Sequence, residues 1–87
     1  MEVIIDIWNE EIRKYEEHIR YKDIKEYDIK CFKSTNSSGL RVIELFNFNE
    51  GKTYDFSLVD YYIDMIKLDN FRGDETLKIN LTKKIKV

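Results

Sequence analysis

The stretch TLKINLTKKIKV, residues 76–87, is the most regular pattern in the chain and decides the fold class. Apolar residues take the odd positions and polar residues the even ones, with Lys83 as the exception. A period of two is typical of a β-strand with one buried and one solvated face, as in an antiparallel sheet covered by helices on one side. The register predicts buried side chains at Leu77, Ile79 and Leu81 and exposed ones at Thr76, Lys78 and Asn80.

Three shorter strands are predicted upstream of this one. Alternation of apolar and polar residues predicts a strand at residues 27–31. The next, at residues 40–48, is expected to be central, because its VIELF segment has apolar residues on both faces. The turn signal NEGK at residues 49–52 leads into a strand at 53–56, so these last two are expected to form a hairpin.

Residues 3–22 are predicted to form a first helix, because apolar side chains recur at intervals of four, four, three and four. These side chains are Ile4, Trp8, Ile12, Tyr15 and Ile19. An alternative stays open at the start. The segment VIIDIW at residues 3–8 is rich enough in β-branched residues for a strand, after which Asn9 would cap a shorter helix.

Residues 57–68 are predicted to form a second helix, with Ser57 as N-cap and Asp60 completing a capping box. Its apolar face comprises Leu58, Val59, Tyr62, Ile63, Met65 and Ile66. Asp60 and Asp64 then lie one turn apart on the solvated face. Like charges at this spacing weaken a helix by about 0.2–0.5 kcal/mol, which favours a role other than stability for them.

The expected element order is therefore α-β-β-β-α-β. It describes a two-layer α+β domain, with an antiparallel sheet of about four strands and two helices. Because the chain has 87 residues, we expect residues 1–87 to be a single compact domain.

The composition excludes several classes of protein. With 43% hydrophobic and 37% charged residues, the chain is expected to be globular and soluble. Its longest apolar runs have three residues, so we expect no membrane span, and the acidic N-terminal segment does not fit an export signal. The single cysteine, Cys31, suits a reducing compartment, and we expect a cytoplasmic protein.

Signatures of catalysis are missing from the sequence. One histidine, His18, and one cysteine cannot build a structural zinc site. The serines fit turns and a cap rather than a nucleophile elbow, and the three glycines are isolated turn residues rather than a phosphate loop. We expect no enzyme activity, no metal and no cofactor.

The charges are unevenly distributed along the chain. Four successive segments, residues 1–19, 20–43, 44–75 and 76–87, carry −4, +3, −5 and +4. The acidic residues from 55 to 75 and two exposed aromatic residues are predicted to bind a protein partner with a basic surface. This predicted set is Asp55, Asp60, Tyr61, Asp64, Asp69, Phe71, Asp74 and Glu75. The alternative is an acidic face that only keeps the protein soluble.

A second hypothesis assigns nucleic-acid binding to the solvated face of the sheet. Its residues would be Lys30, Phe32, Lys78, Lys84 and Lys86. The isoelectric point near 5.4 opposes this hypothesis, because nucleic-acid-binding domains are usually basic.

The expected layout resembles the small anti-CRISPR and related anti-defence proteins of phages and other mobile elements. The similarity lies in a short acidic chain rich in residues with AT-rich codons, a leading helix, a β-meander and an acidic helix at residues 57–68. It implies a non-catalytic inhibitor that blocks a nucleic-acid-binding site on a bacterial defence nuclease complex. Immunity proteins that neutralise toxins have the same layout.

Overall fold

The computed structural model describes residues 1–30, 41–71 and 73–85, and these residues form seven β-strands and no helix. The strands are β1 (Glu2–Asn9), β2 (Lys14–Tyr21), β3 (Ile24–Lys30), β4 (Val42–Asn47), β5 (Lys52–Ser57), β6 (Tyr61–Phe71) and β7 (Asp74–Lys83). The expectation of an α+β domain with two helices is therefore wrong, because the described chain is all β.

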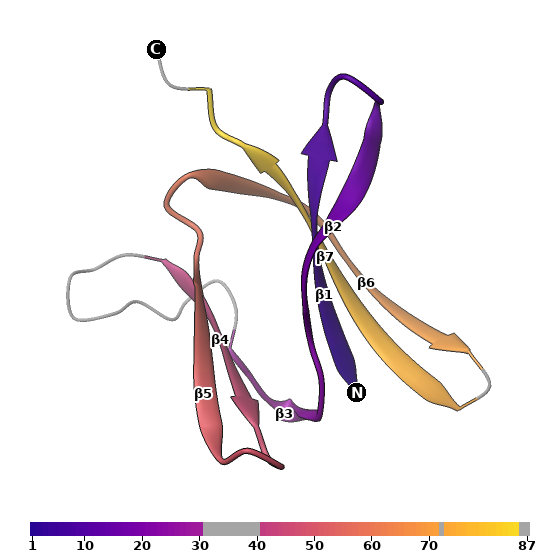
Figure 1. The fold of residues 1–87 in the computed structure, drawn as a ribbon, viewed down its shortest axis with the longest axis vertical. Coiled ribbons are helices and arrows are strands. Elements are labelled where there is room, and N and C mark those ends of the chain that lie inside the picture. Colours follow the sequence, from indigo (N-terminus) through magenta and orange to yellow (C-terminus); the bar gives the residue numbers. More distant parts are fainter. Residues whose placement is uncertain (31–40, 72, 86–87) are drawn as a thin grey trace.

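The strands form two sheets rather than one (Figure 1). Sheet A has four strands in the order β2-β1-β7-β6, and sheet B has three in the order β3-β4-β5. Every neighbouring pair is antiparallel except β1 and β7, the first and last strands, which run parallel in the middle of sheet A. The single antiparallel sheet expected from the sequence is thus also incorrect.

Buried side chains from both sheets form one hydrophobic core. Its members are Val3, Ile5, Tyr21, Ile24, Ile43, Leu45, Leu58, Ile79 and Leu81. Full burial of each aliphatic side chain contributes about 1.5–3 kcal/mol. The core residues of sheet A occupy one face of that sheet, and we call the opposite face the outer face.

The predicted helix at residues 3–22 is instead the hairpin of β1 and β2. Val3, Ile4 and Ile5 are all buried, which a central strand covered on both faces achieves with β-branched residues. The strand alternative for residues 3–8 is therefore confirmed. Asn9, expected to cap a helix, instead accepts a hydrogen bond from the Glu11 backbone N–H at 3.0 Å and shapes the turn.

The predicted helix at residues 57–68 is also wrong, because most of this segment belongs to β6. The Ser57 hydroxyl accepts a hydrogen bond from the Val59 N–H at 3.3 Å, which makes a local turn rather than a helix cap. Leu58, which follows, is 1% exposed and belongs to the core. Asp60 and Asp64, expected one helical turn apart, lie roughly 13 Å apart along an extended chain.

Other predictions are confirmed in full or in part. The regular segment at residues 76–87 contains most of β7, and Ile79 and Leu81 are fully buried, while Leu77 is half-buried. The polar residues on the opposite face, Thr76, Lys78 and Asn80, are half-buried rather than exposed. β4 is the middle strand of sheet B and forms the expected hairpin with β5, whose turn uses Gly51 at a φ of 63°.

Candidate interaction surface

The outer face of sheet A exposes large side chains near one end of the sheet. Tyr15 on β2 is 37% exposed, whereas Tyr62 and Met65 on β6 are 59% and 52% exposed. Tyr62 stands directly opposite Thr82 of β7, and Tyr15 stands opposite Trp8 of β1, so all four strands contribute to this end of the face.

Asp64 connects Tyr15 and Thr82 by hydrogen bonds. Its carboxylate oxygen Oδ2 accepts a bond from the Tyr15 hydroxyl at 2.8 Å and a second bond from the Thr82 hydroxyl. The pairing of β6 with β7 shifts between Ile63 and Met65, which makes Asp64 the extra residue of a β-bulge. Bulges re-aim side chains, and this one leaves both Asp64 and Met65 exposed.

The aromatic rings of this surface are also held in place. The Trp8 and Tyr15 rings meet edge to face, with their centroids 5.1 Å apart, and the Trp8 indole N–H donates a 2.7 Å hydrogen bond to Glu10. The Lys84 ammonium lies 5.0 Å from the centre of the Tyr62 ring. We call Trp8, Tyr15, Tyr62, Asp64 and Thr82 the aromatic row.

Asp64 also changes the acidity of its neighbour. The hydrogen bond to the Asp64 carboxylate, followed by desolvation and by the charge of Asp64, raises the pKa of the Tyr15 hydroxyl above its ordinary value. Tyr15 is therefore a neutral donor at physiological pH.

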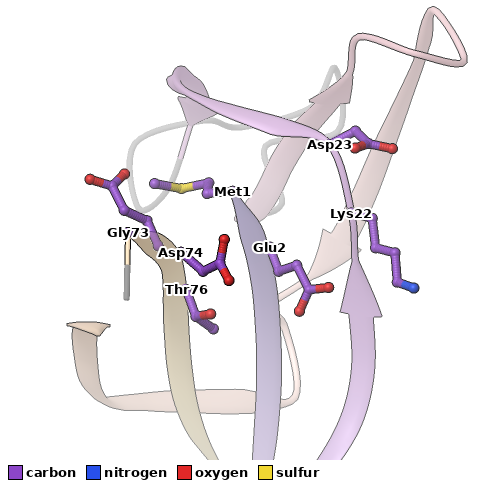
Figure 2. A pocket seen from close by; sticks show the side chains of 8 residues that line it. Met1, Glu2, Lys22, Asp23, Gly73, Asp74 and Thr76 are labelled. Atoms are coloured by element: carbon purple, nitrogen blue, oxygen red, sulfur yellow. The ribbon is translucent and has the colours of Figure 1, made fainter. Parts of the chain in front are cut away.

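Acidic side chains gather around a hollow at the other end of sheet A, roughly 20 Å from the aromatic row. The described residues that line the hollow include Glu2, Asp23, Asp74 and Glu75 together with Lys22 (Figure 2). Glu2 already forms an ion pair with Arg20, at 2.5 Å. Figure 2 shows the Asp23 carboxylate pointing away from Glu2 and Asp74, so the carboxylates do not converge on one point.

The residues predicted to bind a protein partner are distributed over both sheets. Asp55 is exposed on β5 in sheet B, while Asp74 and Glu75 border the acidic hollow. Tyr61, expected to be exposed, is half-buried against the core, and its ring centre lies 5.6 Å from that of Phe56.

The remaining members of the set lie on or beside β6. Asp60 is half-buried just before the strand, and its carbonyl accepts a hydrogen bond from the Lys84 N–H at 2.8 Å. Asp69 is half-buried on the outer face, with a carboxylate oxygen 3.4 Å from the Lys67 ammonium. Phe71 ends β6, but its side chain is outside the described part of the structure. Only Asp64 belongs to the aromatic row.

The residues of the nucleic-acid hypothesis are only partly described. Lys78 lies on the outer face, directly opposite Lys67 of β6, and Lys84 contacts Tyr62. Lys30 belongs to β3, but its side chain is outside the described residues. Phe32 and Lys86 are outside them entirely.

Sequence reasoning missed Trp8 and Tyr15 as surface residues, because it placed both on the buried stripe of a helix. The strand alternative for residues 3–8 could have indicated on which face Trp8 lies. In a strand, Trp8 takes the opposite face from Ile5, which is buried in the core.

Comparison with protein-family models, with curated proteins and with solved structures gives no match. Within residues 1–30, 41–71 and 73–85, no three His, Cys, Asp or Glu side chains are grouped to hold a metal ion. The same described part of the chain has no helix that could cross a membrane.

Proposed function

We propose that this chain is a small non-catalytic binding protein that occupies a basic surface on a protein partner and thereby inhibits it. The observation that carries the proposal is the aromatic row, in which Tyr15 and Tyr62 are exposed beside the half-buried Trp8. Asp64 orients the Tyr15 hydroxyl of this row. The resemblance to anti-defence proteins no longer supports it, because both helices of that layout are strands.

The row has the physical properties of a binding hot spot. Tryptophan and tyrosine dominate such sites because they bury a large area and lose little side-chain entropy. Hydrogen bonds from Tyr15 to Asp64 and from Trp8 to Glu10 fix these two rings before a partner arrives. Preorganisation of this kind lowers the entropic cost of association.

The charges next to the row favour a basic partner. Asp64 lies within it and Glu10 at its margin, and the chain carries a net charge of −2. The acidic hollow at the far end of the sheet adds to the negative potential. Such a potential attracts a basic surface, including one made for nucleic acid, and speeds association at low salt.

Two substitutions in the row test the proposal once a partner has been captured from the source lysate and purified. Tyr62→Ala removes a ring that is 59% exposed, and Asp64→Lys reverses the central charge. We expect each to raise the dissociation constant measured by calorimetry about tenfold or more, which corresponds to about 1.4 kcal/mol.

Asp55→Lys is the matched control, because it reverses an exposed aspartate on the other sheet. We expect it to change the affinity much less than Asp64→Lys does. If Asp55→Lys and Asp64→Lys weaken binding equally, the net charge of the protein, and not the aromatic row, determines the affinity. Unchanged affinity in Tyr62→Ala and Asp64→Lys, with circular dichroism showing both folded, would refute the aromatic row as the binding surface.

One observation favours nucleic acid as a second candidate ligand. Lys67 and Lys78 stand directly opposite each other on the outer face, and like charges in this arrangement destabilise a sheet. Bases could stack on Tyr62 while Lys78 and Lys84 contact phosphates. Fluorescence anisotropy with single-stranded and duplex oligonucleotides tests this, and Lys78→Glu with Lys84→Glu should abolish binding that uses these lysines.

A further inference from the structure

β6 is an edge strand of sheet A, and among the described residues it is hydrogen-bonded on one side only, to β7. It is 11 residues long, the longest strand among the described residues. The hairpin of β6 and β7 projects away from sheet B in Figure 1, so its lower half stands clear of the other sheet. A long free edge of this kind is a template for another strand.

The half of β6 from Met65 to Phe71 is suited to such pairing. It pairs with β7 without interruption, because the bulge lies before Met65. It also exposes two large apolar side chains, Met65 at 52% and Leu68 at 51%. Soluble proteins usually protect an exposed sheet edge. Exposed apolar side chains at Met65 and Leu68 therefore indicate that a partner covers the free edge of β6.

We propose that a second copy of this chain covers it, with the two β6 strands antiparallel and Leu68 on the two-fold axis. Lys67 then stands opposite the partner's Asp69, and Asp69 opposite the partner's Lys67. Each chain also pairs these two residues internally, with the ammonium and carboxylate 3.4 Å apart, so both lie on the same face of the strand.

Charge favours this register, because among those that keep equivalent faces together it is the one that brings Lys67 opposite the partner's Asp69. A register centred on Lys67 places the two lysines opposite each other, and a register centred on Asp69 does the same for the two aspartates. Like charges directly opposite destabilise a pair of strands, whereas opposite charges stabilise it. A register shifted by a single residue would bring the outer face of one copy against the core face of the other.

The resulting dimer is closed, because the free edge of β6 is paired in both copies. Sheet A continues into its counterpart as one sheet of eight strands, and Leu68 meets the partner's Leu68 beside Leu77, its neighbour on β7. An isologous contact of this kind does not propagate into fibres. Tyr62 precedes the bulge and Asp64 lies in it, both outside the paired segment from Met65 to Phe71, so the aromatic row stays accessible and the inference is independent of the proposed function.

A charge-swap experiment tests both the dimer and its register. Sedimentation equilibrium of the wild-type chain should give twice the monomer mass of 10.6 kDa. K67D makes both facing positions acidic and D69K makes both basic, so each variant alone should be monomeric. An equimolar mixture of K67D and D69K should dimerise, because every facing pair is then complementary, although each chain has lost its internal pair.

K83D is the control, because it reverses an exposed lysine at the far end of β7 and should leave the dimer intact. L68K is a second disrupting variant, since it places like charges on the two-fold axis. A monomeric wild type overturns the proposal. Dimerisation of K67D, D69K and L68K at wild-type strength would also overturn it. The same holds if K67D and D69K are each monomeric and their mixture stays monomeric.

Discussion

Asp64 joins strands β2, β6 and β7 across the outer face, because its carboxylate accepts hydrogen bonds from Tyr15 and Thr82. We predict that removing its carboxylate lowers the pKa of Tyr15, since the hydrogen bond to that carboxylate is the main reason the pKa is raised. The difference in tyrosinate absorbance between wild type and Tyr15→Phe isolates this one group. The midpoint of the Tyr15 titration should lie above that of an ordinary tyrosine. The same midpoint should be lower when Asp64 is replaced by alanine.

The sign of the associated stability change follows from the same shift. A raised pKa in the folded state means that folding favours the protonated phenol. The stabilisation is therefore complete below the pKa of the unfolded tyrosine and is lost as the pH rises through the folded value. An identical Tyr15 midpoint with and without Asp64 would contradict this account.

Asn47 shows what a buried polar residue contributes. It is 5% exposed, its side-chain N–H donates to the Lys22 carbonyl at 2.7 Å, and its side-chain oxygen accepts from the Glu50 N–H at 2.8 Å. We predict that Asn47→Ala lowers the free energy of unfolding in urea by about 1–3 kcal/mol, because it leaves both backbone partners unsatisfied. Asn49→Ala, at an exposed position of the same turn, should change it by less than about 0.5 kcal/mol.

At the scale of elements, intervals of four explain the first wrong helix. Four residues are nearly one helical turn, but they are also two full periods of a strand, so Ile4 and Trp8 satisfy both patterns. Ile12 then falls in the turn between β1 and β2, where it is 49% exposed.

This difference gives a direct test of the hairpin. Ile5 is fully buried and lies outside the predicted helical stripe, whereas Ile12 belongs to that stripe and is exposed. We predict that Ile5→Ala costs about 2–5 kcal/mol of stability and Ile12→Ala less than about 0.5 kcal/mol, both from urea unfolding. The reverse order would contradict the hairpin and support the helix predicted at residues 3–22.

The bulge at Asp64 explains the second wrong helix. Ile63 and Ile66 both pack against the core, although they are three residues apart, because the extra residue shifts the alternation by one. Intervals of two and three within one strand then imitate the period of a helix. A bulge forms only against a partner strand, so β6 alone carries no sign of it.

At the scale of the whole molecule, the parallel pair of β1 and β7 holds sheet A together. These two strands have neighbours on both sides, whereas β2 and β6 are paired on one side within the part of the chain that the structure describes. We predict the slowest amide hydrogen exchange in β1 and β7 and faster exchange in β2. Protection of β2 equal to that of β1 would contradict this order. Protection in Ile66, Leu68 and Asn70 that rises with protein concentration would agree with the dimer.

The sequence by itself determined the local properties of the chain. The alternation in residues 76–87 predicts β7, and apolar residues on both faces of VIELF predict the central position of β4. These patterns are readable because each depends on neighbours in the chain and on one simple period. The acidic character of residues 55–75 was also visible, but not which of these residues share a surface.

Only the tertiary structure decided whether residues 3–22 and 57–68 are helix or strand, and where the candidate surface lies. Both segments have patterns compatible with either conformation, so their partner strands decided between them. Tyr15, Asp64 and Thr82 meet because the first strand of the chain, which carries β2 beside it, pairs in parallel with the last, and because β6 bulges at Asp64. Such a contact depends on sheet order and register, which are set by burying one shared core rather than by any local run of residues.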